Sequence, residues 1–416
     1  MPLLSGRKRD ATGRGNMKFK QLLKTFTILG CACVLAATFA ACGNNEEDPP
    51  AAKKTHDPVT LEVTGQPGTY EPHNFVDGKC TMCDETTIFT QDSIARDDIV
   101  TKACDEQGTV EEIKYATDAY PDWQYADENG LVTKTAWVYL PYGYDAADTS
   151  TKYNVLILMH GKGLNEGYWF AKGSYAYPAQ QGAYLSGGNG TANLLDTMMK
   201  EGTAEKTIVV TPTVYLPGED GKTANGNSEE GDANMAAGRA GFKDELLNDL
   251  MPYIAENYNT YAEVTGDMTA EQVDAALKAA RAHQGYAGLS MGSVISYDTI
   301  WSGCLEYFSY IGSYSGGVTA EELPALLSAI SDFEDCKIGY WYACLGTSET
   351  SSTYYGDPFG TYRALLENFS GLQSGSDLAA GDNCQYMLCN NTAHNYTTWI
   401  TGLYNCMQVF FKADIA

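Results

Sequence analysis

Residues 286–297 read YAGLSMGSVISY and carry the strongest structural signal in this chain. The first four residues are apolar or small, as in a buried strand, and the part that follows Gly292 has the character of a helix. Between them stands a G-x-S-x-G pentapeptide, residues 288–292. A sharp strand-to-helix turn that lifts a serine oxygen above a sheet is crowded, so it needs glycine on both sides. The stretch therefore predicts that Ser290 is a nucleophile; the alternative is an ordinary tight turn.

On both sides of this turn, strand patterns alternate with helix patterns. The runs 154–159 and 207–212 are almost continuously apolar or β-branched, as expected for buried parallel strands. Further strands are expected at 109–115, 135–140, 285–289, 307–313, 337–345 and 384–388, and helices at 242–258, 269–283, 292–301, 320–330, 360–368 and 396–412. The alternation predicts an α/β fold, with a mostly parallel central sheet and helices on both faces. The Gly-, Asn- and Glu-rich insert 218–241 is expected to be a surface loop near the site.

A nucleophilic serine needs a base, and the order of residues along the chain selects one histidine. In folds with this type of turn, an acid and then a histidine follow the serine. The chain has five histidines, of which only His394 lies downstream of Ser290. His394 stands in a polar loop between the last expected strand and the last expected helix. From such a loop an imidazole can reach the serine and remove its proton.

A carboxylate must orient that imidazole and stabilise its positive charge. The expected position is just after the strand that ends near residue 346. Glu349 is the first carboxylate there, and Asp357 is the second choice.

Two backbone N–H groups are expected to bind the oxyanion that forms when the serine attacks a carbonyl carbon. One is the N–H of Met291, directly after the nucleophile. The other should come from the loop 160–166, which follows the strand at 154–159, and we expect it to be the N–H of Lys162. His160 opens this loop and is interpreted as a structural turn residue.

Taken together, these segments resemble the esterase D / feruloyl esterase family of α/β-hydrolases. The matching pieces are VYLPYGYD (138–145), LMHG (158–161), AGLSMG (287–292), and His394 with Trp399 five residues on. They keep the family's order over about residues 108–412. Two positions depart from the family pattern. Ser293 stands where a second glycine is usual, and Glu349 stands where aspartate is usual.

The resemblance implies a serine carboxylic ester hydrolase that requires no cofactor for catalysis. Its substrate would be an acylated carbohydrate or a small ester, with feruloyl or acetyl groups on plant polysaccharide as the leading expectation. Trp399, close to His394 in the sequence, is the aromatic residue that we expect to contact substrate. The alternatives are an acyltransferase that uses a sugar hydroxyl in place of water, and a non-catalytic carbohydrate-binding lipoprotein on a hydrolase fold.

The charge of the chain excludes one class of partner. The 416 residues carry 27 basic and 53 acidic side chains, a formal net charge of −26. Nucleic-acid phosphates would be repelled by such a surface, so we expect no nucleic-acid partner.

The N-terminus predicts export. From Met17 the chain has a basic start, an uncharged stretch over 25–41, and small residues directly before Cys42. This arrangement resembles a bacterial lipoprotein signal, which implies cleavage before Cys42, a lipid on its thiol, and a place on the extracellular face of the cell membrane. An ordinary secretory signal and a membrane-spanning helix are the alternatives. Residues 1–41 are thus assigned to the signal. Residues 1–16 are interpreted as an over-long start assignment, with translation beginning at Met17.

Three segments are expected after the signal. The polar residues 42–58 are interpreted as a disordered tether, residues 59–104 as a small His/Cys-x-x-Cys unit, and residues 105–416 as the esterase domain. In the small unit, His73, Cys80 and Cys83 offer three ligands for a structural zinc ion. His56 or Cys104 could be the fourth ligand. A disulfide and two free thiols are the other interpretations of Cys80 and Cys83. The sequence leaves the cysteine pairing open.

Overall fold

The computed structural model describes residues 54–93, 99–173, 190–221 and 228–415. Residues 53–416 form one compact unit. The predicted signal (1–41), Cys42 as the predicted site of lipidation, and the predicted tether up to residue 53 lie outside the described residues. Within the described ranges, no helix has both the length and the apolar character that a membrane crossing requires.

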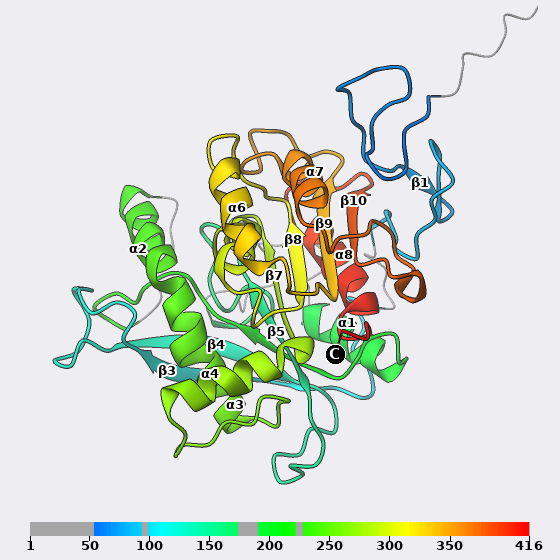
Figure 1. Ribbon diagram of the computed structural model, residues 1–416. Helices are drawn as coiled ribbons and strands as arrows, with labels where there is room; N and C mark the ends of the chain where they lie inside the picture. Colours follow the sequence, from blue (N-terminus) through cyan, green and yellow to red (C-terminus); the bar gives the residue numbers. More distant parts are fainter. Residues whose placement is uncertain (1–53, 94–98, 174–189, 222–227, 416) are drawn as a thin grey trace, which may run out of the picture. The chain divides into compact units, whose positions relative to one another are not determined.

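A central eight-stranded sheet has the strand order β10-β9-β8-β7-β5-β6-β4-β3 (Figure 1). Its strands are β3 (Thr109–Thr117), β4 (Val132–Leu140), β5 (Asn154–Met159), β6 (Thr207–Thr211), β7 (Gln284–Leu289), β8 (Tyr310–Tyr314), β9 (Tyr340–Gly346) and β10 (Cys384–Cys389). The strands from β10 to β6 pair in parallel, whereas β4 pairs antiparallel with both β6 and β3. The mostly parallel sheet predicted from the sequence is confirmed.

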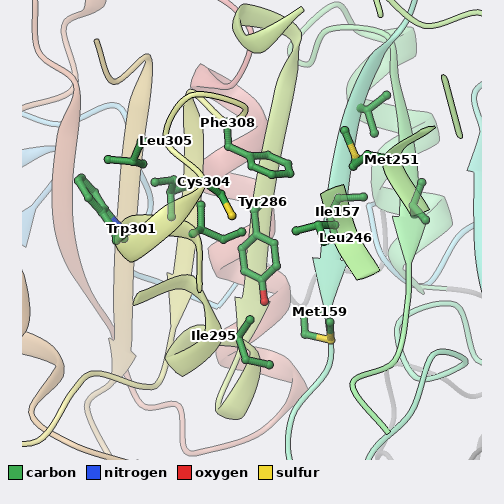
Figure 2. Close-up of a cluster of buried hydrophobic side chains, with 14 of the residues drawn as sticks. Ile157, Met159, Leu246, Met251, Tyr286, Ile295, Trp301, Cys304, Leu305 and Phe308 are labelled. Atoms are coloured by element: carbon green, nitrogen blue, oxygen red, sulfur yellow. The ribbon is translucent and has the colours of Figure 1, made fainter. Parts of the chain in front are cut away.

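Helices cover both faces of this sheet. They are α1 (Gly190–Lys200), α2 (Glu229–Glu245), α3 (Met251–Asn257), α4 (Ala270–Ala279), α5 (Met291–Ile295), α6 (Leu323–Ile330), α7 (Pro358–Asn368) and α8 (Tyr396–Val409), with π-helical turns at Leu246–Leu250 and Ser296–Trp301 and 3-10 turns at Arg281–His283, Ser331–Phe333 and Leu378–Ala380. The side chains of β5 divide between the two layers. Ile157 and Met159 pack with residues of α2 to α7, and Leu156 and Leu158 pack with residues of α1 and α8. Figure 2 shows the first layer, where Ile157 lies beside Leu246.

The structure differs from the sequence-based expectation in the insert 218–241. Residues 229–241 are helical and belong to α2, which continues through residue 245. The Ser228 side chain caps this helix by accepting a hydrogen bond from the Gly231 N–H, and three acidic residues occupy the first turn. These N-terminal signals stabilise a helix in spite of the glycine- and asparagine-rich composition. Helix α1 was also not expected from the sequence.

A small N-terminal layer packs on the edge of the sheet formed by β10. It contains the hairpin of β1 (Phe75–Val76) and β2 (Lys79–Cys80), which pair antiparallel. Asp77 and Gly78 form the turn, with φ angles of 50° and 74°, as two-residue hairpin turns require. The segment of the layer that follows the hairpin is hydrogen-bonded to the sheet: the Thr87 hydroxyl donates to Oε1 of Gln385 on β10 at 2.6 Å.

The end of the predicted tether is corrected by the structure. Residues 54–58 are part of the folded layer, where His56 forms an antiparallel bridge with Val63. His56 is also buried, with 4% of its surface exposed. The expectation of a tether to residue 58 rested on polar and proline-rich composition, which does not report the long-range contacts of His56.

A buried ion pair joins β4 to α2 and gives a testable prediction. Lys134 Nζ lies 2.6 Å from Glu245 Oε2, and both side chains are almost fully buried. The hydroxyls of Tyr115 and Tyr120 also donate to this carboxylate. Replacing Lys134 by Met leaves a buried, uncompensated charge, so we expect the free energy of unfolding to fall by about 3–5 kcal/mol in a denaturant titration.

Two variants control for this measurement. The double variant Lys134→Met/Glu245→Gln removes both charges and should recover most of the lost stability, since the amide oxygen still accepts from one tyrosine and the NH₂ group can donate to the hydroxyl oxygen of the other. Lys152→Met breaks the exposed pair with Glu263 and should cost less than about 1 kcal/mol. An equal loss in all three variants would contradict the prediction.

Candidate active site

Ser290 occupies the sharp turn between β7 and α5. Its backbone is left-handed, with φ 52° and ψ −113°, which is strained for a residue with a side chain. The turn is as crowded as expected. A Cβ on Gly288 would come within 2.5 Å of the Gly292 carbonyl carbon, and one on Gly292 within 2.6 Å of the His160 oxygen. Both glycines of the pentapeptide are therefore required by close approach of the backbone.

His394 and Glu349 meet Ser290 at the carboxyl ends of the parallel strands. His394 Nε2 lies 2.9 Å from Ser290 Oγ, and His394 Nδ1 lies 2.6 Å from Glu349 Oε2. An ionised carboxylate can only accept hydrogen bonds. The Nδ1–H therefore donates to Glu349, which leaves Nε2 free to accept the proton of the serine hydroxyl. The structure thus brings together three residues that are 104 and 45 positions apart in the chain.

The Glu349 carboxylate is fully buried and has three partners. Besides its contact with His394, its Oε1 accepts hydrogen bonds from the Gly346 N–H at 2.8 Å and from the Ser315 hydroxyl at 2.7 Å. Ser315 was not singled out in the sequence, and no motif marks it. Its left-handed backbone, with φ 60°, is visible only in the structure.

Asp357, the second choice for the acid, is not brought to His394. It is exposed and stands at the N-cap of α7, where its carboxylate accepts a hydrogen bond from the Gly360 N–H at 2.9 Å. An aspartate directly before a proline at the first helical position is a typical helix start. This local role accounts for its position.

A cavity of about 240 Å³ opens at the serine. It is lined by Gly161, Lys162, Leu164, Tyr168, Leu289, Ser290, His394, Asn395 and Trp399. Two N–H groups of the loop after β5 are already donated within the protein, that of Gly163 to the Tyr215 hydroxyl and that of Leu164 to the Gly161 carbonyl. Lys162, whose N–H is the expected oxyanion donor from this loop, lines the cavity. Met291, the other expected donor, is the first residue of α5.

Trp399 lines the same cavity but is mostly buried, with 6% of its surface exposed. Its ring stands edge-on to the His394 ring, with centroids 5.2 Å apart. Its indole N–H donates to Ser315 Oγ at 3.0 Å, and the Ser315 hydroxyl in turn donates to Glu349. Trp399 therefore lines the cavity and also supports the carboxylate through Ser315.

His160 takes the structural position expected for it. It is buried, its Nε2 lies 2.9 Å from the Thr213 hydroxyl, and its ring stacks on Tyr215. Burial lowers the pKa of His160 to about 4, so the folded protein holds this ring neutral.

The lowered pKa of His160 predicts acid-sensitive stability. Between about pH 6.5 and 4, this histidine is protonated in the unfolded chain, where its pKa is near 6.5, but stays neutral in the folded protein. The free energy of unfolding is therefore unaffected by this group above about pH 6.5 and falls as the pH drops toward about 4, by about 3 kcal/mol in total. Urea unfolding at about pH 7, 5.5 and 4.5 measures it. The variant His160→Gln should lose correspondingly less stability over this range, and identical pH slopes for variant and wild type would refute the assignment.

A second group of ligand-type side chains lies in the N-terminal layer. The side-chain ligand atoms of His56, His73, Cys80 and Cys83 all lie within 4.8 Å of one another, so this cluster could hold a metal ion. Cys104, the other candidate for the fourth ligand, is not in the cluster, and its thiol donates to Asp105. The nine cysteines among the described residues are free thiols.

The chain has sequence similarity to two curated enzymes. It is 33% identical over 192 residues to endo-1,4-beta-xylanase Y of Acetivibrio thermocellus. That alignment covers 46% of this chain and 14% of the relative. It is 27% identical over 285 residues to an endo-1,4-beta-xylanase/feruloyl esterase of Xylanibacter ruminicola. That alignment covers 67% of this chain and 29% of the relative. The chain therefore spans less than a third of the length of either relative. No protein-family profile matches it.

Solved structures with the same fold include two esterases. A mutant of the feruloyl esterase module from Clostridium thermocellum, complexed with sinapinate, aligns with a TM-score of 0.56 and 22% identity over 79% of this chain and 96% of that one. A ferulic acid esterase from the anaerobic fungus Anaeromyces mucronatus aligns with a TM-score of 0.52 and 19% identity over 78% of this chain and 98% of that one.

The sheet, the serine turn and the order serine, glutamate, histidine along the chain define an α/β-hydrolase fold. Within that class, the chain resembles the feruloyl esterases, in agreement with the resemblance found in the sequence.

Proposed function

We propose that this chain is an extracellular serine carboxylic ester hydrolase that removes feruloyl or acetyl groups from plant polysaccharide or its fragments. The observation that carries the proposal is the continuous hydrogen-bonded path from Ser290 through His394 to Glu349, at the wall of an open cavity. The kinship with a xylanase/feruloyl esterase and the fold shared with feruloyl esterases support the choice of ester.

The proposed reaction begins when Ser290 Oγ attacks the ester carbonyl carbon while His394 Nε2 takes the hydroxyl proton. The oxyanion that forms is bound by the N–H groups of Met291 and Lys162. As the intermediate collapses, His394 returns the proton to the departing alcohol, and the acyl group stays on Ser290. Water, deprotonated by His394, then releases the acid and restores the serine. Glu349 stabilises the imidazolium in both halves of the cycle.

The size and lining of the cavity favour a compact acyl group. Its described walls combine Leu164 and Leu289 with the rings of Tyr168 and Trp399. An aromatic acyl group such as feruloyl can lie against such rings, with edge-to-face contacts worth about 0.5–1.5 kcal/mol. A cavity of about 240 Å³ accommodates a compact acyl group.

The proposed location follows from the N-terminal signal. Export and a lipid on Cys42 would hold the enzyme at the outer face of the cell membrane, where polysaccharide fragments are available. Incorporation of a labelled fatty acid into the wild type and not into Cys42→Ser tests the anchor. Equal labelling of both proteins would refute it.

The substrate class is tested by assaying four esters side by side: methyl ferulate, p-nitrophenyl acetate, feruloylated arabinoxylan and acetylated xylan. We expect hydrolysis of methyl ferulate or of the acetyl esters, with release of ferulate or acetate from at least one polysaccharide. Failure to hydrolyse any of the four by protein that carries the folded Ser290 site would overturn the proposed function.

A further inference from the structure

The cluster of His56, His73, Cys80 and Cys83 takes no part in the proposed ester hydrolysis, yet it is built like a site. His56, His73 and Cys80 are 3–4% exposed, and Cys83 is half-buried. The four residues come from separate places in the N-terminal layer. His56 lies in a β-bridge, His73 precedes β1, Cys80 ends β2, and Cys83 lies in the turn that follows.

Four of the six distances between the ligand atoms are close to those around a tetrahedral zinc ion, and the other two are at most 4.8 Å. Zinc–nitrogen and zinc–sulfur bonds of about 2.0 and 2.3 Å place neighbouring ligand atoms about 3.3–3.8 Å apart. His56 Nε2 lies 3.2 Å from His73 Nδ1, 3.3 Å from Cys83 Sγ and 3.6 Å from Cys80 Sγ. His73 Nδ1 lies 3.4 Å from Cys83 Sγ.

The hydrogen bonds around the two rings direct their nitrogen lone pairs at the same point. His56 Nδ1 lies 3.0 Å from the Glu71 carbonyl oxygen, so the ring donates its N–H there and Nε2 carries the lone pair. The His73 ring hydrogen-bonds to the backbone of Pro58, which has only a carbonyl to offer. Its Nδ1 then also carries a lone pair. Two lone pairs that face each other at 3.2 Å repel, and either a proton on one ring or a metal ion between the two nitrogens removes the repulsion. A carbonyl behind each metal-bound ring is the usual arrangement.

The sulfur atoms are supported in the same way. The Met82 N–H donates to Cys80 Sγ at 3.4 Å, and the backbone of Glu85 hydrogen-bonds to Cys83. The backbone of a Cys-x-x-Cys turn thus points its N–H groups at both sulfurs, as it does where thiolates bind a metal.

The layer that carries the cluster has few buried apolar residues, and Leu61, Phe75 and Phe89 belong to the hydrophobic clusters of the central sheet, so the layer depends on ties to that sheet. Gln91 forms one such tie. Its side chain accepts from the Phe75 N–H at 2.8 Å, and its carbonyl accepts from the Asn390 N–H at 2.6 Å. Asn390 directly follows β10 and begins the loop that carries His394. Small segments with little core commonly need a metal or a disulfide to hold their shape.

We propose that His56, His73, Cys80 and Cys83 bind one Zn²⁺ in a closed tetrahedral site that fixes the N-terminal layer, residues 54–93, against the β10 edge of the sheet. Two histidines and two thiolates leave no open position for water, so the ion is structural. The site stands apart from ester hydrolysis, and its test is independent of the proposed function.

Elemental analysis of the purified full-length protein should find one zinc per chain. Cys80→Ser and His56→Gln should each lower the zinc content to below about a tenth of the wild-type value under mild chelation. Cys104→Ser is the matched control, because Cys104 lies beyond the cluster, and it should keep its zinc. If a variant fails to fold, native mass spectrometry of the wild-type protein tests zinc binding instead. The native mass should exceed the mass of the chain by that of one zinc ion less two protons, which the two thiols lose.

The stabilisation of the N-terminal layer by zinc is tested by hydrogen exchange on wild-type protein before and after zinc removal. We expect amide exchange to rise at least about tenfold over residues 73–92 and to stay unchanged in β7, since the ion constrains only its own layer. Wild-type protein without metal, with iron in place of zinc, or with a mass deficit of two hydrogens from a Cys80–Cys83 disulfide would overturn the proposal. Unchanged amide exchange on zinc removal would overturn the claim that the ion fixes the N-terminal layer.

Discussion

Replacement of Ser290 by alanine is expected to lower kcat on methyl ferulate or p-nitrophenyl acetate by about 10⁵- to 10⁶-fold. The change deletes the oxygen that lies 2.9 Å from His394 Nε2 and leaves the oxyanion donors and the cavity in place. Without the nucleophile, only direct attack by water remains, which the binding site can assist weakly. Stopped assays with high enzyme concentration measure the residual rate.

The matched control for this prediction is Ser293→Ala. Ser293 belongs to the same turn, but its hydroxyl is buried and donates to the Gly316 carbonyl at 3.0 Å instead of facing the cavity. We expect its kcat to stay within about fivefold of the wild type, with a loss of stability of about 1 kcal/mol for the missing hydrogen bond. If Ser290→Ala kept more than about one hundredth of the activity, another group would have to be the nucleophile.

The fold could be predicted because its signals are local. The apolar run of β5 fits a strand buried on both faces, and the glycines on both sides of Ser290 are required because a Cβ on either would come within 2.5–2.6 Å of backbone atoms. His394 followed from order along the chain, because it is the one histidine downstream of the serine. In each case a short segment contains the reason for its own structure.

Other features could not be predicted because their causes are distant in sequence. Glu349 and Asp357 are both carboxylates after β9, and only the chain path shows that one reaches His394 while the other caps α7. Ser315 supports Glu349 across 34 positions, and no pattern around it signals that contact. His56 was assigned to the tether on composition, although a ring 17 residues away, that of His73, lies beside it in the fold.

These distant contacts show why a glutamate can serve at a position where the family uses aspartate. The two oxygens of the Glu349 carboxylate have separate partners: Oε2 lies 2.6 Å from His394 Nδ1, and Oε1 accepts hydrogen bonds from other residues. Gly346 and Ser315 hold Oε1, and Trp399 holds Ser315, so Oε2 is fixed toward the imidazole. The carboxylate therefore gains its orientation from three neighbours, and the extra methylene adds little freedom.

Glu349→Gln is expected to lower kcat by about 10³- to 10⁴-fold with KM changed by less than about threefold. The amide keeps the shape but loses the charge that stabilises the imidazolium. The Gly346 N–H needs an acceptor at Oε1, so the new NH₂ group must face His394 Nδ1. That contact favours the tautomer with the proton on Nε2, which cannot accept the proton of Ser290.

Asp357→Asn separates this electrostatic role from a general loss of negative charge near the site. Asparagine caps helices about as well as aspartate, so α7 should keep its start and the protein its stability. Its kcat should stay within about twofold of the wild type. If Asp357→Asn and Glu349→Gln had equal effects, the carboxylate beside His394 would act only as part of the surrounding field. Loss confined to Glu349→Gln would instead mean that catalysis depends on the direction in which one buried carboxylate holds the imidazole.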